Sequence, residues 1–148
     1  FSYIFSSPLI RSLQTAKIIA PDHQILIDER LIEMDYGPYE GMDLNHPAEE
    51  VLRFFSDFGN VKAPEGMETL SEVVARTGAF LQEIRTLSGN ILISTHAIAM
   101  KGVLENLDKE SRGSWWSKYI GNCAVYVFEN RNGVFTAPIE FISGKERE

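Results

Sequence analysis

The sequence has few of the residues that build disulfides and metal centres. Cys123 is the single cysteine among 148 residues, so no intramolecular disulfide can form, which fits a cytoplasmic protein. The three histidines are scattered along the chain, and together with one cysteine they give none of the spacings typical of zinc ligands. The sequence therefore predicts neither a metal nor another cofactor.

Basic residues and long apolar runs are also scarce. The chain has 14 lysines and arginines against 21 aspartates and glutamates, which gives a net charge of −7. This balance argues against nucleic-acid binding, because that function needs a basic face. No apolar run approaches the roughly 18 residues that cross a membrane, so no membrane partner is predicted. The negative net charge does not exclude a small phosphorylated metabolite as a partner, because a few local cations are enough to bind a phosphate group.

The remaining composition is that of an ordinary globular protein. Hydrophobic residues make up 44% and charged residues 24% of the chain, and its length fits one domain over residues 1–148. The sequence begins with Phe1 rather than methionine, and an apolar run follows at once. We therefore expect an N-terminal truncation, with an upstream part of the protein missing. The oligomeric state is left open, a homodimer included.

Short apolar runs alternate with segments of helical periodicity along the chain. The predicted strands are 2–6, 24–27, 90–95, 123–128 and 134–142, and the predicted helices are 8–20, 47–58, 70–89 and 97–107. A capping box at Thr69 and Glu72 starts the third helix, and residues 130–133 are predicted to form a hairpin turn. This order predicts an α/β three-layer sandwich: a mainly parallel sheet, helices on both faces and a closing antiparallel hairpin.

Reactive side chains follow two of these strands, at the edge where α/β sheets carry their sites. After strand 2–6, Ser7 and Pro8 are predicted to cap and open a helix. Arg11 then lies beside the free N–H groups of that helix, where a cation can bind phosphate. The alternative for Arg11 is a solvated surface arginine.

His96 immediately follows strand 90–95 and precedes a helix. Its ring N–H could face a bound anion together with the backbone N–H groups of Ala97 and Ile98. The alternative is a hydrogen-bonded histidine at a strand end. His23 and His46 are predicted to be loop histidines without a role in the site.

A carboxylate-rich segment, residues 28–45, also carries glycines and is predicted to form a loop, here called the acidic loop. Such carboxylates are usually solvated, but Glu33, if it lies near a phosphate pocket, could act as a general acid.

Three further predictions concern single residues. Trp115 and Trp116 are predicted to pack a loop, Lys101 to be solvated, and Cys123 to be buried as a small hydrophobic residue.

Taken in order, these segments resemble the histidine phosphatase superfamily, also called phosphoglycerate mutase-like. The similarity covers nearly the whole chain, and the first block and the strand that ends in histidine are its most specific parts. The blocks that carry it are Ser6-Ser7-Pro8-Leu9-Ile10-Arg11, Leu31-Ile32-Glu33, Gly37, Glu40-Gly41, 64–70 with Arg76, Ile91 to His96, and Asn122-Cys123.

The resemblance implies site residues and a chemistry. Arg11 matches the arginine that binds the transferred phosphoryl group, Glu33 the proton donor, and His96 the second histidine of the phosphate pocket. Ala97 replaces a usual glycine but keeps the backbone N–H, so it is counted among the phosphate-binding residues with a minor effect. The family's nucleophile is a histidine in an Arg-His-Gly motif, which these 148 residues do not contain.

The expected activity is metal-independent hydrolysis of a small phosphate monoester through a phosphohistidine. The resemblance implies that the truncation removes a first strand and helix together with the nucleophile, which is expected upstream of Phe1. The 148-residue chain alone should therefore be inactive. The resemblance favours hydrolysis over mutase activity, because the mutases of the family are generally longer in this region, where only about 30 residues separate Gly41 from Leu70. Cations in this region are also few, Arg53 and Lys62. Mutase-type phosphoryl transfer and a non-catalytic phosphoester-binding protein are the alternatives.

Overall fold

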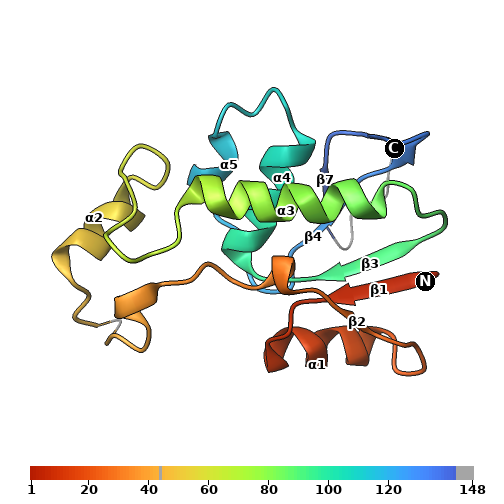
Figure 1. The fold of residues 1–148 in the computed structure, drawn as a ribbon, viewed down its shortest axis with the longest axis horizontal. Coiled ribbons are helices and arrows are strands. Elements are labelled where there is room, and N and C mark those ends of the chain that lie inside the picture. Colours follow the sequence, from red (N-terminus) through yellow and green to blue (C-terminus); the bar gives the residue numbers. More distant parts are fainter. Residues whose placement is uncertain (44, 143–148) are drawn as a thin grey trace.

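Three short strands form a parallel sheet in the order β2-β1-β3 (Figure 1). The computed structural model describes residues 1–43 and 45–142; residue 44 of the predicted acidic loop and residues 143–148 of the predicted domain lie outside them. β1 (Tyr3–Ser6) pairs with both β2 (Leu26–Ile27) and β3 (Ile91–Ser94). Because all three strands run the same way, their carboxyl ends share one edge of the sheet.

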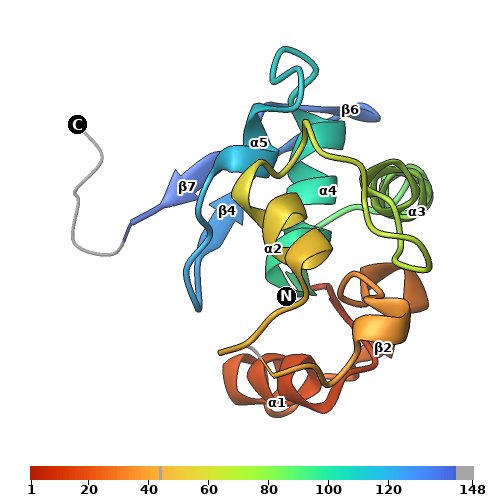
Figure 2. The same ribbon diagram turned by 90° about the vertical axis from the view of Figure 1, so that its left-hand side faces the viewer.

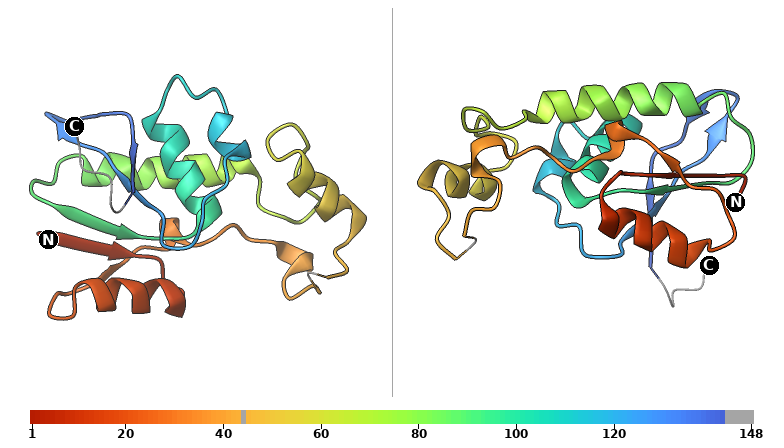
Figure 3. Two further views of the ribbon diagram at one scale, coloured as in Figure 1. Left: turned by 180° about the vertical axis from the view of Figure 1, so that it is seen from behind. Right: turned by 60° about the horizontal axis from the view of Figure 1, so that its bottom comes forward.

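Helices cover both faces of this sheet, which confirms the predicted α/β architecture. α1 (Ile10–Ile19) lies on one face, and α3 (Leu70–Ile84) and α4 (Ala97–Leu107) lie on the other (Figure 1). Figure 3 shows the same layers from behind and from below. Ala16 of α1 and its C-cap Ala20 pack on the buried Ile4 of β1, and larger apolar side chains fill the space under α3 and α4.

The two helices on the second face approach each other closely at Gly102. A Cβ atom at this position would lie 2.8 Å from Cγ1 of Val73 and 2.9 Å from Oγ1 of Thr77. One turn further on, the side-chain amide of Asn106 donates to the backbone oxygens of Val74 and Gly102, at 2.9 and 2.8 Å. The absence of a side chain at Gly102 therefore sets the separation of α3 and α4.

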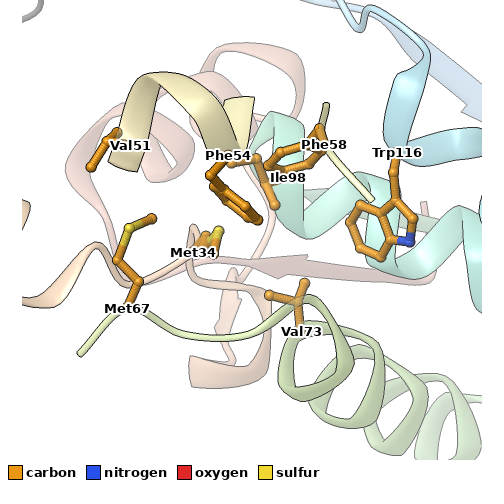
Figure 4. Close-up of a cluster of buried hydrophobic side chains, with 8 residues drawn as sticks. All are labelled: Met34, Val51, Phe54, Phe58, Met67, Val73, Ile98 and Trp116. Atoms are coloured by element: carbon orange, nitrogen blue, oxygen red, sulfur yellow. The ribbon is translucent and has the colours of Figure 1, made fainter. Parts of the chain in front are cut away.

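A second layer of packing lies beyond the carboxyl edge of the sheet. The 3-10 helix η2 (Gly37–Tyr39) and the helix α2 (Glu49–Ser56) belong to this region, with α2 facing the viewer in Figure 2. The 3-10 helix η1 (Glu29–Leu31) packs against α3 instead, with Leu31 buried in the cluster under α3 and α4. The core of this second layer is a cluster that α5 (Ser114–Ser117) completes with a tryptophan. Figure 4 shows the members: Met34, Val51, Phe54, Phe58, Met67, Val73, Ile98 and Trp116. Phe54 of α2 is fully buried in this cluster, whereas Phe55 is partly exposed.

Two antiparallel strand pairs close the described chain. β4 (Val125–Val127) pairs with β7 (Ile139–Phe141), and β5 (Asn130–Arg131) pairs with β6 (Val134–Phe135). The turn between β5 and β6 is Asn132-Gly133, with φ angles of 56° and 82°. Positive φ at both turn residues suits the twist of a two-residue hairpin. The predicted hairpin is therefore confirmed, although its strands are interrupted.

Several local predictions were wrong. α1 begins at Ile10 rather than Pro8, and its N-cap is Leu9, so Ser7 is not the cap. Cys123 is exposed, because its φ of 59° places it in a turn rather than in a strand. Lys101 is half-buried and not solvated: its ammonium donates to the backbone oxygen of Trp116 at 2.8 Å.

None of the helices in the described ranges is long and apolar enough to cross a membrane.

Candidate active site

Three buried serines join the carboxyl edge of the sheet to the first turn of α1. The hydroxyl of Ser12 donates to that of Ser94 at 2.9 Å and lies 3.0 Å from that of Ser6. The Ser94 hydroxyl in turn donates to the backbone oxygen of Ser12 at 2.9 Å. Because Arg11 precedes Ser12 in the same helical turn, these bonds place Arg11 at this edge. The sequence analysis missed this network, since serines that are far apart in the chain give no periodic signal.

The structure brings Arg11 and His96 into direct contact. Nε of Arg11 donates to Nδ1 of His96 at 3.2 Å, and Nε2 of His96 lies 2.7 Å from the hydroxyl of Ser7. A guanidinium can only donate, so Nδ1 carries no proton and the neutral ring carries its proton on Nε2. Ser7 is therefore the acceptor for His96, and it also accepts the N–H of Leu9 at 3.3 Å.

The surroundings of His96 favour the neutral imidazole. Burial lowers the pKa of His96, the nearby charge of Arg11 lowers it further, and the Glu33 carboxylate acts in the opposite direction. Only 8% of the residue is exposed. An anion that entered the site would reverse this balance, because it would favour the protonated ring.

Glu33 lies at the amino end of α4, directly beside the turn that His96 begins. Its Oε1 accepts the backbone N–H groups of Met34 and Ala99 at 2.9 and 3.0 Å, and its Oε2 accepts that of Ile98 at 3.3 Å. The amino end of a helix carries partial positive charge, so a carboxylate is well placed there. The N–H of Ile98, expected to face a bound anion, instead bonds Glu33.

The charge of Glu33 affects the pKa values of two neighbouring side chains, Tyr36 and Lys101. Burial and the carboxylates of Glu33 and Glu40 raise the pKa of Tyr36 to about 12, while the charge of Arg11 opposes them. Burial lowers the pKa of Lys101, and Glu33 acts against this shift. The ammonium of Lys101 also lies 5.0 Å from the centre of the Phe58 ring. Neither residue was assigned to the site from the sequence.

Ala97, His23 and His46 are all exposed in the structure. Ala97 is exposed on the first turn of α4, without positive φ, so its Cβ causes no backbone strain there. His23 and His46 are exposed in loops, as predicted, and His46 lies 2.8 Å from the Asp43 carboxylate. Within the described ranges, no three histidine, cysteine, aspartate or glutamate side chains gather so as to hold a metal ion.

Comparisons with known proteins find relatives that match most of this chain. The family model described as "Histidine phosphatase superfamily (branch 1)" matches residues 1–138. Phosphoserine phosphatase 1 of Hydrogenobacter thermophilus is 30% identical over 143 residues, which cover 87% of this chain and 66% of that protein. The chain thus spans just under two thirds of this relative's length.

Two further proteins are similar over most of the chain. A 2,3-bisphosphoglycerate-dependent phosphoglycerate mutase 2 of Gloeobacter violaceus is 27% identical, covering 92% of this chain and 68% of that protein. Among solved structures, Bacillus stearothermophilus YhfR superposes with a TM-score of 0.79 at 26% identity, covering 93% of this chain and 72% of that one.

Proposed function

Because the chain belongs to the histidine phosphatase superfamily, we propose that it is part of a phosphatase that hydrolyses a small phosphate monoester. The observation that carries this proposal is the contact between Arg11 and His96, 3.2 Å apart at the carboxyl edge of the sheet. Both side chains can donate hydrogen bonds to an anion, and the neighbouring backbone of α4 adds positive potential.

In the proposed ground state, a phosphoryl group replaces the direct bond between the two side chains. The guanidinium of Arg11 and the protonated ring of His96 then donate to its oxygens, with the N–H of Ala97 as a further donor. Such preorganised donors stabilise the charge that spreads over the equatorial oxygens during phosphoryl transfer. Protonation of His96 is coupled to binding, because the free site favours the neutral ring.

Glu33 is the proposed proton donor. A histidine nucleophile attacks phosphorus, an N–P bond forms, the ester P–O bond breaks, and Glu33 gives its proton to the departing oxygen. Water then attacks the phosphohistidine while Glu33 takes a proton from it, which releases phosphate and restores both groups. The nucleophile itself is expected upstream of Phe1, and reading the encoded sequence there for an Arg-His-Gly motif tests that expectation.

The region over the site favours hydrolysis over mutase activity. The ring of Phe55 on α2 packs edge-on against that of Tyr36, with the ring centres 6.0 Å apart, and stacks on that of Phe58 at 5.3 Å. The region between α2 and Tyr36 is therefore aromatic. Arg53, a cation of the same helix, already pairs with Glu49 at 2.9 Å. A bisphosphate needs a second set of cations, whereas a monoester does not. The similar phosphoglycerate mutase keeps mutase-type transfer as an alternative.

A non-catalytic phosphoester-binding protein is the second candidate, favoured by the lack of an Arg-His-Gly motif in the 148 residues. The encoded upstream sequence separates the two. An Arg-His-Gly motif there supports the enzyme, and a gene product that starts without it supports the binder.

Phosphate release from p-nitrophenyl phosphate and phosphoserine by the complete encoded protein tests the activity, between pH 5 and 8 with a chelator present. We expect turnover of at least one of them; no turnover across this range would contradict the proposal. The site can be tested on the 148-residue chain itself by NMR. Inorganic phosphate should raise the pKa of His96, and the ring signals of the exposed His23 and His46 serve as internal controls.

A further inference from the structure

We propose that Arg76 and Glu68 are positioning residues that fix the backbone on both sides of Glu33. The inference rests on the proposed role of Glu33 as proton donor, which gives its position a chemical consequence. Both residues lie outside the contact between Arg11 and His96. Arg76 belongs to α3, and Glu68 lies just before it.

Arg76 contacts the segment that precedes Glu33. Its Nη1 donates to the backbone oxygens of Arg30 and Ile32, both at 2.7 Å. Its Nε and Nη2 donate to the two carboxylate oxygens of Glu68 at 2.6 and 3.0 Å. These side chains are only 17% and 14% exposed, so the pair is largely removed from water.

Glu68 contacts the segment that follows Glu33. Its Oε2 accepts the backbone N–H of Asp35 at 3.1 Å, and its own N–H donates to the backbone oxygen of Asp35 at 2.8 Å. The chain is therefore held at Arg30 and Ile32 on one side of Glu33 and at Asp35 on the other. One ion pair connects the two sides.

This part of the acidic loop has little regular structure to fix it. Between η1 and η2 the backbone forms neither helix nor strand, and Glu33 contacts α4 through its carboxylate. A misplacement of about 1 Å at a reacting group can reduce a rate about 100-fold. Contacts that fix the flanking backbone are therefore what a proton donor on such a loop requires.

Direct binding of substrate by Arg76 is a weaker explanation. Of its five N–H donors, one at Nε, two at Nη1 and one at Nη2 are already used by Glu68 and the two backbone oxygens. Backbone oxygens cannot move away without distorting the loop. The guanidinium is thus committed to the protein rather than to a ligand.

The test compares Arg76→Gln and Glu68→Gln with the control Glu83→Gln. Glu83 also lies on α3 and also pairs with the acidic loop, through the Arg30 side chain at 2.8 Å, but it touches no backbone beside Glu33. Amide NMR shifts of Met34, Ile98 and Ala99 report the Glu33 carboxylate directly, because these three N–H groups donate to it. We expect both variants, and not the control, to move these signals.

In the complete encoded protein, the same two variants should lower kcat by about 10- to 100-fold with KM nearly unchanged. Arg76→Lys, which keeps the charge but not the paired donors, should recover only part of this loss. Unmoved Met34 and Ala99 signals in a folded Arg76→Gln chain would overturn the proposal; if that variant does not fold, the same result for Glu68→Gln does so. Should Glu33→Gln leave turnover intact, the proton-donor role fails, while the NMR comparison still decides the positioning.

Discussion

Arg11 and His96 are 85 residues apart in the chain, yet their side chains meet at 3.2 Å. One stands in the first turn of α1 and the other begins α4, so each follows a different strand of the same parallel sheet. The contact forms because the register pairs Ser6 with Ser94, which brings the two strand ends level.

The exposed Arg11 guanidinium should matter for activity more than for stability. Arg11→Ala removes a proposed donor to the phosphoryl oxygens, so we expect kcat/KM of the complete protein to fall about 100- to 1000-fold. Lys17→Ala, which removes an exposed cation from the same helix, should change little. A loss of tenfold or less in Arg11→Ala would place Arg11 outside the phosphate site.

Stability should depend on pH through His96. Its folded pKa lies below the usual 6.5, so as pH falls through about 6.5 the unfolded chain takes up a proton before the folded chain does. The free energy of unfolding should therefore decrease between pH 7.5 and 5.5, and less so in His96→Gln. Urea unfolding at both pH values measures this, with the exposed His23→Gln as control. Equal slopes for wild type and His96→Gln would contradict the assigned shift.

Ser7 should contribute through its buried hydroxyl rather than as a helix cap. Ser7→Ala leaves the Nε2 proton of His96 and the N–H of Leu9 without their acceptor, at a cost of about 1–3 kcal/mol. The variant should also change the tautomer balance of His96, which its ring nitrogen NMR shifts report. Ser88→Ala, at an exposed position, is the matched control and should be neutral. An equally small effect of Ser7→Ala would exclude this role.

Packing of α3 against α4 should be sensitive to a single methyl group at Gly102. Gly102→Ala places Cβ within 2.9 Å of side-chain atoms of Val73 and Thr77, and overpacking of this kind costs about 1–3 kcal/mol. The better helix propensity of alanine offsets roughly 1 kcal/mol of that. Thermal unfolding should therefore show a lower melting temperature. Gly121→Ala should show little change, because a Cβ atom there would lie 3.5 Å from its nearest neighbour, Cε1 of Tyr119. A higher melting temperature for Gly102→Ala would contradict the prediction.

Local features of the fold were predictable because their signals are short. The capping box formed by Thr69 and Glu72 is present, with Oγ1 of Thr69 accepting the N–H of Glu72 at 3.2 Å. The helix at Ala97–Leu107 has its predicted bounds, and Asn132-Gly133 forms the predicted turn. Each depends on residues within a few positions of one another, where capping, periodicity and allowed φ angles act directly.

The sequence by itself determined the order of strands and helices, because hydrophobic periodicity and turn residues act over short distances. It also determined that Arg11 and His96 follow strands and that Glu33 lies in a loop. Only the tertiary structure decided that Ser7 accepts from His96, that Glu33 bonds the first turn of α4, and that Arg76 bonds the acidic loop. These contacts join residues that lie 44 to 89 positions apart. Strand register and helix packing set such distances, and neither can be predicted from a pattern of neighbouring residues.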